Sequence, residues 1–179
     1  MTFWCENCQQ DLDGHPTSAE VDEANAIVGR IQVAFNGVVL GNGMTIHEAD
    51  LEGVFESELS RRIAREKDVE RNWSDVPDWK CSALFSALYA FDAEGWKFYL
   101  PAYMCWALRN WRRTNSPTME WLIGSLTQRN GFANHFSTLT FDQSNAVLSF
   151  LQFCRFYVDK VAAANAISVY WSRFEAQVS

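Results

Sequence analysis

The residue pattern with the clearest metal-binding chemistry is a pair of cysteines near the start of the chain, Cys5 and Cys8. A Cys-x-x-Cys turn supplies two thiolates for zinc, and His15 is close enough in sequence to serve as a third ligand. No second Cys-x-x-Cys or His-x-x-x-His pair completes a tetrahedral set nearby. A thioredoxin-type redox role is disfavoured, because that motif requires a preceding strand and a following helix. A zinc site and an ordinary terminus without a metal both remain open, and zinc is the one cofactor that the sequence suggests.

A second candidate cluster combines a histidine with carboxylates at the starts of two expected helices. His47 and Asp50 are three residues apart, so on a helix they share a face, where they could hold a metal or transfer a proton. Asp92 and Glu94 begin a later helix. Each residue also has a structural interpretation, since Glu48 closes a capping box, Asp50 favours the helix dipole and Asp92 is an expected N-cap. The metal or acid–base interpretation requires His47, Asp50, Asp92 and Glu94 to converge in space.

The sequence lacks the common signatures of enzyme active sites. It has no Gly-x-Ser-x-Gly, His-Glu-x-x-His, Walker or Gly-x-Gly-x-x-Gly motif. The segment Gly41-Asn42-Gly43 is too short to cradle a phosphate, and no lysine or arginine follows it closely. We therefore lean towards a protein that is not an enzyme.

Every strong periodic signal in the chain is helical, which predicts an all-α fold. Capping boxes that begin at Thr17, Thr45 and Thr140 predict three helix N-termini. Gly53 is expected to divide the charged segment that follows the second box into two pieces. Pro101 lies inside an expected aromatic-rich helix and predicts a kink or a break there.

Length and composition set the domain organisation and the compartment that we expect. The chain has 179 residues, 48% of them hydrophobic, which favours one folded domain and excludes a disordered protein. We expect a compact bundle of about six to seven helices over residues 17–179, after an extended N-terminal segment over residues 1–16. No apolar run is long enough to span a bilayer, and the start does not look like a secretory signal. The odd number of cysteines, 5, is typical of reduced thiols, so a cytoplasmic location without membrane association is expected.

The net charge of −7 is concentrated in the first third of the sequence. Residues 1–60 hold 11 acids and one base and so carry −10, whereas residues 61–179 hold 11 acids and 14 bases and carry +3. An acidic protein is a poor general nucleic-acid binder, because that role requires a basic surface. The acidic residues that could form a binding face are Glu48, Asp50, Glu52, Glu56 and Glu58.

Aromatic residues make up 15% of the chain, which is more than an ordinary helical core of this size requires. Most are expected in the core. A few tryptophans lie beside charged or polar residues and could be partly exposed, namely Trp73, Trp79, Trp111, Trp121 and Trp171. Trp111 and Arg112 are adjacent, which is a composition favoured at interaction hot spots.

Three stretches read together resemble an uncharacterised bacterial family, a domain of unknown function. They are the box at residues 43–50, Gly-Met-Thr-Ile-His-Glu-Ala-Asp, the turn Trp-Ser-Asp-Val-Pro at residues 73–77, and a core that includes Asp-Ala-Glu-Gly-Trp-Lys-Phe-Tyr-Leu-Pro-Ala at residues 92–102. The resemblance covers roughly residues 20–157. It implies a compact, mostly helical fold and supplies no catalytic residues.

Two functional hypotheses follow from these patterns. The first is a non-enzymatic bacterial interaction protein, more sharply an immunity or antitoxin-type protein that binds a basic partner through its acidic face. Electrostatic steering between opposite charges would raise the association rate. The second is a metal-binding protein or metal-dependent enzyme that uses the histidine–carboxylate cluster or the two cysteines. The sequence does not indicate the oligomeric state.

Overall fold

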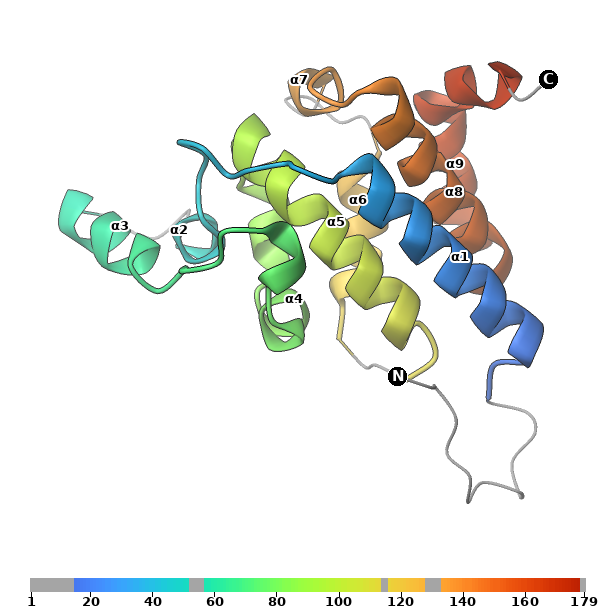
Figure 1. The fold of residues 1–179 in the computed structure, drawn as a ribbon, viewed down its shortest axis with the longest axis horizontal. Helices are drawn as coiled ribbons and strands as arrows, with labels where there is room; N and C mark the ends of the chain where they lie inside the picture. The colour runs from blue at the N-terminus through green and yellow to red at the C-terminus, as the bar shows by residue number, and fades with distance from the viewer. Residues whose placement is uncertain (1–14, 52–56, 114–115, 128–132, 178–179) are drawn as a thin grey trace.

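The computed structural model describes residues 15–51, 57–113, 116–127 and 133–177, and these residues form an all-helical fold without a strand (Figure 1). They contain nine α-helices and three 3-10 helices. The all-α prediction is therefore confirmed. The helices outnumber the six to seven expected, because several expected segments are divided into short pieces. Over this described part, no helix has the length and apolarity needed to cross a membrane.

Three long helices form the body of the molecule. They are α1 (Ser18–Ala34), α5 (Ala93–Asn110) and α8 (Phe141–Tyr157). Helix α5 lies in the middle, with α1 packed against both α5 and α8 (Figure 1). Helix α9 (Lys160–Val169) and the 3-10 helix η3 (Trp171–Gln177) cover α8, and α6 (Thr118–Ser125) packs against α5 and α9.

Helix α5 is buried on nearly all sides, because other elements of the fold surround it. Nearly every residue from Gly95 to Leu108 is buried, Lys97 being the exception. The side chain of Asp92 caps its N-terminus by accepting a hydrogen bond from the backbone N–H of Gly95 at 2.7 Å. Pro101 lies within the helix and does not end it, so the break that the sequence suggested is absent. Tertiary packing around α5 thus outweighs the local preference of proline to end a helix.

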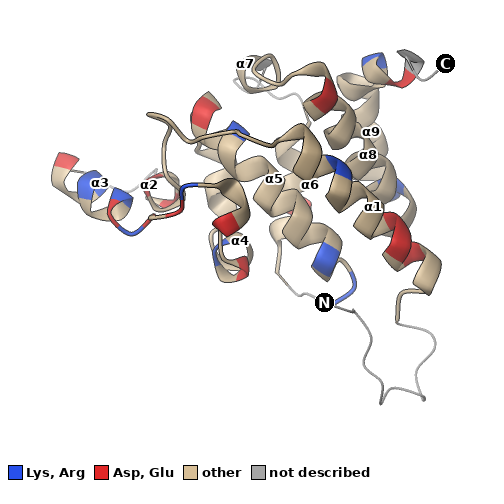
Figure 2. Ribbon diagram, viewed as in Figure 1, with Lys and Arg blue, Asp and Glu red and all other residues tan. Residues whose placement is uncertain are grey.

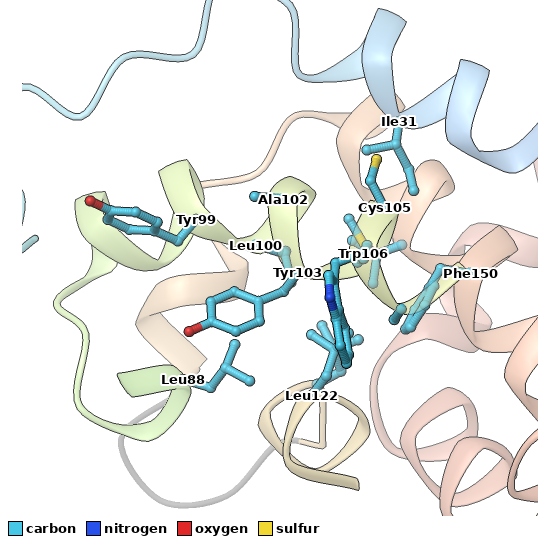
Figure 3. Close-up of a cluster of buried hydrophobic side chains, with 14 of the residues drawn as sticks. Ile31, Leu88, Tyr99, Leu100, Ala102, Tyr103, Cys105, Trp106, Leu122 and Phe150 are labelled. Atoms are coloured by element: carbon cyan, nitrogen blue, oxygen red, sulfur yellow. The ribbon is translucent and has the colours of Figure 1, made fainter. Parts of the chain in front are cut away.

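The core gathers aromatic and aliphatic side chains around α5 (Figure 3). Tyr103 and Trp106 of α5 lie among Leu88, Leu122 and Phe150, all of them at most 3% exposed. At the edge of its ring, the Tyr103 hydroxyl donates a hydrogen bond to Leu84 O at 2.5 Å. Most of the aromatic residues are thus used to fill helix junctions.

Two of the tryptophans considered as partly exposed belong to this core. Trp73 and Trp171 are 7% and 0% exposed, and their indole N–H groups donate to Phe35 O and Leu126 O at 2.9 and 2.8 Å. Trp79 is 55% exposed, and Trp111 and Trp121 are half-buried.

Several short helices connect the long ones. The segment after Asp78 forms α4 (Asp78–Ala83) and then the 3-10 helix η2 (Phe85–Tyr89). A further 3-10 turn, η1 (Trp73–Asp75), precedes α4, and the short helix α7 (Ala133–Phe136) precedes α8.

The charged segment after Thr45 forms two helices, as expected. They are α2 (Ile46–Asp50) and α3 (Glu58–Arg65), and Gly53 lies outside the described residues. Helix α3 stands at one end of the molecule, far from α8 and α9, and packs mainly on α2 (Figure 1).

Candidate interaction surface

Four charged or titratable side chains meet where α2, the turn after α3 and α4 come together. The ring Nδ1 of His47 is 2.7 Å from Asp68 Oδ1, and the backbone N–H of His47 donates to Asp68 Oδ2 at 3.0 Å. The ammonium group of Lys80 donates to Asp68 and to Glu70, both at 2.6 Å. The side chains of Lys80, Asp68 and Glu70 are only 3%, 1% and 7% exposed. We call these four residues the charge network.

Contacts within the charge network favour the charged forms of Asp68 and Lys80. Burial alone would raise the pKa of Asp68, but hydrogen bonds from Lys80 and His47 outweigh it and hold the pKa below its usual value. Burial likewise disfavours the charged form of Lys80, yet the two carboxylates raise its pKa above the ordinary lysine value. Lys80 is therefore a protonated partner of two carboxylates and not a nucleophilic amine.

The charge network joins three elements of the fold. It draws one residue from α2, two from the turn after α3 and one from α4. Within it, His47 is oriented by a buried carboxylate, an arrangement that is also found in general bases.

The four residues of the predicted histidine–carboxylate cluster have different partners. His47 pairs with Asp68, and Asp50 accepts a hydrogen bond from Ser86 at 2.7 Å. Asp92 accepts from the backbone N–H groups of Gly95 and Met44, which ties the preceding loop to α5. Glu94 is exposed. No group of three or more histidine, cysteine, aspartate and glutamate residues that could hold a metal occurs among the described residues.

The predicted acidic face is only partly visible in the described residues. Glu48 closes the capping box with Thr45 and forms an ion pair with Arg65 of α3 at 2.8 Å, so its charge is used within the molecule. Asp50 and Glu58 are exposed. Glu52 and Glu56 lie outside the described residues. Figure 2 shows that α3 itself carries blue basic as well as red acidic positions.

The predicted zinc ligands also lie largely outside the part that is described. Cys5 and Cys8 fall within residues 1–14, and His15 is exposed at the first described position. The zinc site therefore stays a prediction. The three cysteines in the described part are buried, and burial raises the pKa of Cys81 and of Cys105 to about 12, which makes both poor thiolate ligands.

Trp111 and Arg112 contact other parts of the same chain. The Arg112 guanidinium lies 4.2 Å from the centre of the Trp111 ring and donates to Glu20 of α1 at 3.1 Å. The Trp111 ring contacts Phe153 edge-on, with the ring centres 5.3 Å apart. The two residues thus connect the end of α5 to α1 and α8. The Arg112 guanidinium and the Trp111 ring both make contacts within the chain.

Two apolar side chains of α3 are exposed. Leu59 is 61% exposed and Ile63 is 50% exposed, and the two are one helical turn apart. Ala64, on the inner side, is 2% exposed and faces the body. Arg62 and Glu66, an exposed pair 3.7 Å apart, flank the apolar residues. We call Leu59, Arg62, Ile63 and Glu66 the α3 face.

Sequence reasoning missed both the charge network and the α3 face. No local pattern singles out Asp68, Glu70 or Lys80, because only the fold brings their side chains together. The i, i+4 spacing of Leu59 and Ile63 is a signal that the sequence does contain, since it places both side chains on one face of a helix.

The arrangement defines a compact helical protein with an exposed apolar helix face supported by buried ion pairs. The chain belongs to a family of unknown function, DUF6714, which matches residues 23–175. The expectation of an uncharacterised family is thereby confirmed, while the particular motifs and a bacterial origin stay predictions. Comparison with curated proteins and with solved structures gave no match.

Proposed function

We propose that this protein acts by binding another protein, with the α3 face as the contact surface, and not by catalysis. The observation that carries the proposal is the exposure of Leu59 and Ile63 on one side of a helix at the end of the molecule. Burial of such a side chain in an interface is worth about 1.5–3 kcal/mol. Apolar side chains that gather on a surface with a polar rim are typical of interaction sites.

The support behind α3 makes this surface suitable for binding. Helix α3 is tied to α2 by the Arg65–Glu48 ion pair, and α2 is tied to α4 through the charge network. A preorganised surface loses less conformational entropy on association than a flexible one. We therefore assign Glu48 to the ion pairs that hold α3 in place, and not to the surface that contacts the partner.

The partner in this proposal is a basic protein. The chain carries a net charge of −7, and long-range steering depends on the charge of the whole molecule. Asp50 and Glu58 are the exposed carboxylates of the predicted acidic face in the described residues, and Glu52 and Glu56 extend the set in sequence. The sharpest form of the proposal is an immunity or antitoxin-type protein that covers a basic toxin.

The test is quantitative capture from cells that naturally contain the protein. Tagged wild-type protein is compared with the Leu59→Asp/Ile63→Asp variant and with Val33→Asp, a control at a valine that is 80% exposed on α1. Circular dichroism first confirms that all three are folded. We expect wild type and Val33→Asp to retain the same basic protein, and the α3 variant to lose it.

Two results would contradict the proposal. If wild type retains no specific protein, or if the α3 variant retains as much as wild type, α3 is not the contact surface. If the captured protein is acidic, the basic-partner form is wrong. The metal-dependent alternative is checked by metal analysis of the full chain, where about one equivalent removed by Cys5→Ser/Cys8→Ser would assign zinc to the N-terminal segment.

A further inference from the structure

A second feature is a pocket of about 970 Å³ that lies between η2, α6 and α9. It is separate from the α3 face, since none of its lining residues belongs to α2 or α3. The volume falls within the range of ligand pockets, which is roughly 300–1,000 Å³. The side chains that line the pocket indicate which class of ligand it fits.

The wall of this pocket includes two half-buried aromatic rings, Tyr89 and Trp121. Their ring centres are 5.1 Å apart in an edge-on arrangement, and Phe85 supports Trp121 from a centre distance of 5.3 Å. Gly124 allows Tyr89 to lie close over α6, because a Cβ at that position would be 2.0 Å from the tyrosine hydroxyl. The two rings are therefore held in place by the packing of η2 on α6 before any ligand arrives.

The charged residues of the pocket are all acidic in the part of the chain that the structure describes. Glu120 and Asp159 line it, and no lysine or arginine does. Asp159 uses one oxygen, Oδ1, to accept from the backbone N–H groups of Val161 and Ala162 at 2.9 Å, which caps α9. Such a lining favours a positive charge and disfavours an anion, because it offers an anion no cationic partner.

We propose that the η2–α6–α9 pocket binds an organic cation of the quaternary-ammonium class. Aromatic faces attract such cations through the ring quadrupole, and they do so without demanding a hydrogen-bond donor. The apolar part of the ligand contacts Met119, which shares the lining, while Glu120 and Asp159 supply the opposite charge. The assignment is independent of the protein-binding role of α3.

The test is a charge series of three molecules with the same branched head. Choline is positive, 3,3-dimethylbutan-1-ol is neutral and 3,3-dimethylbutanoate is negative. Binding is followed by the NMR signal of the Trp121 indole N–H, which a Trp121→Phe variant assigns. We expect choline to bind roughly two- to fivefold more tightly than the neutral alcohol, the factor that one exposed cation–π contact supplies, and the anion to bind most weakly.

A charge-removing variant completes the experiment. Glu120→Gln/Asp159→Asn removes both charges, and asparagine is as good an N-cap as aspartate, so α9 remains capped. We expect this variant to show a smaller preference for choline over the alcohol than wild type does, because only the contribution of the aromatic rings remains. The matched control Asp142→Asn/Glu175→Gln, in a different groove between α1, α8 and η3, should keep it. The proposal is overturned if the alcohol binds as tightly as choline, if none of the three shifts the Trp121 signal, or if both variants behave alike.

Discussion

At the scale of single residues, Lys80 is a buried cation that pairs with two buried carboxylates. Its ammonium group is the bridge between two carboxylates, each 2.6 Å away and nearly inaccessible to water. Glu70 also has one buried oxygen, Oε2, without a hydrogen-bond partner, so its charge depends on Lys80 all the more. Removal of the lysine would leave two uncompensated negative charges in a buried place.

We therefore predict that Lys80→Met lowers the free energy of unfolding by about 3–5 kcal/mol, the usual cost of breaking a buried ion pair from one side. Lys160→Met is the matched control, since Lys160 is exposed on α9. Its effect should stay within about 0.5 kcal/mol. Urea denaturation followed by circular dichroism measures both values, and equal effects of the two substitutions would show that the charge network does not stabilise the fold.

Asp68 gives the protein a pH dependence with a definite sign. Because its pKa is lowered from 3.8 on folding, it stabilises the folded state above that pH, and this contribution is lost as the pH falls through the folded value. Lys80 has a raised pKa, so its contribution is present below 10.5 and is lost only as the pH rises through the folded value. Asp68 and Lys80 are thus both charged across the neutral range.

We expect Asp68→Asn to be less stable than wild type at neutral pH, and the difference to shrink as the pH is lowered below about 4, the usual pKa of a free aspartate. Asp22→Asn, at an exposed aspartate of α1, should follow the wild-type pH profile. Urea midpoints from pH 2 to pH 7 test this expectation. A gap between Asp68→Asn and wild type that does not change with pH would mean that Asp68 acts without its charge.

The sequence placed His47 in a candidate cluster, but it did not identify the carboxylate that binds its ring. A carboxylate 21 residues away binds its ring, and that contact depends on the turn after α3. Of the other members of the predicted cluster, Asp50 was suggested by its spacing from His47, and Asp92 and Glu94 by their place at the start of a later helix. Spacing predicts contacts within a helix, whereas contacts between elements follow from how the elements pack.

At the scale of elements, the junction between the loop before α2 and the start of α5 depends on two glycines. A Cβ on Gly95 would be 2.4 Å from Met44 O, and one on Gly43 would be 2.6 Å from Gly95 N. Both obstacles are backbone atoms, which do not move aside as a side-chain end does. The absence of side chains therefore lets the loop contact the first turn of α5, where Asp92 also binds Met44 N.

The same substitution at two glycines should have opposite effects. We predict that Gly95→Ala destabilises the protein by roughly 1–3 kcal/mol, the usual cost of overpacking. Gly29→Ala in α1 should stabilise it by about 0.5–1 kcal/mol, since nothing lies within 4 Å of the added Cβ and alanine is the better helix former. Thermal denaturation of both variants checks the prediction, and a loss of stability in Gly29→Ala or none in Gly95→Ala would contradict it.

Local signals predicted helix starts well and helix continuity poorly. The capping boxes at Thr17, Thr45 and Thr140 are all present, because each depends only on a residue and its neighbour three positions on. Pro101 was expected to kink or break α5, and the helix continues through it, since burial on all sides stabilises that helix. The division between α4 and η2 at Leu84 has no strong sequence signal and follows from packing against α5 and α6.

At the scale of the whole molecule, the uneven charge of the sequence is partly balanced by folding. Glu48 of the acidic third pairs with Arg65, and Glu20 pairs with Arg112, so acidic and basic parts of the chain are brought together. The fold class was predictable because helical periodicity runs through the chain. The α3 face was not, because its exposure depends on how α2 and α3 project from the body (Figure 1).

The central claim is that α3 contacts a partner protein, and site-specific photo-crosslinking tests it most directly. A photoreactive amino acid is placed at Leu59 in one variant and at Val161 in another, a valine that is 79% exposed on α9. The binding account predicts one crosslinked species of defined mass from position 59 in native cells, and none from position 161. Equal crosslinking from both positions, or none from position 59, would contradict the account.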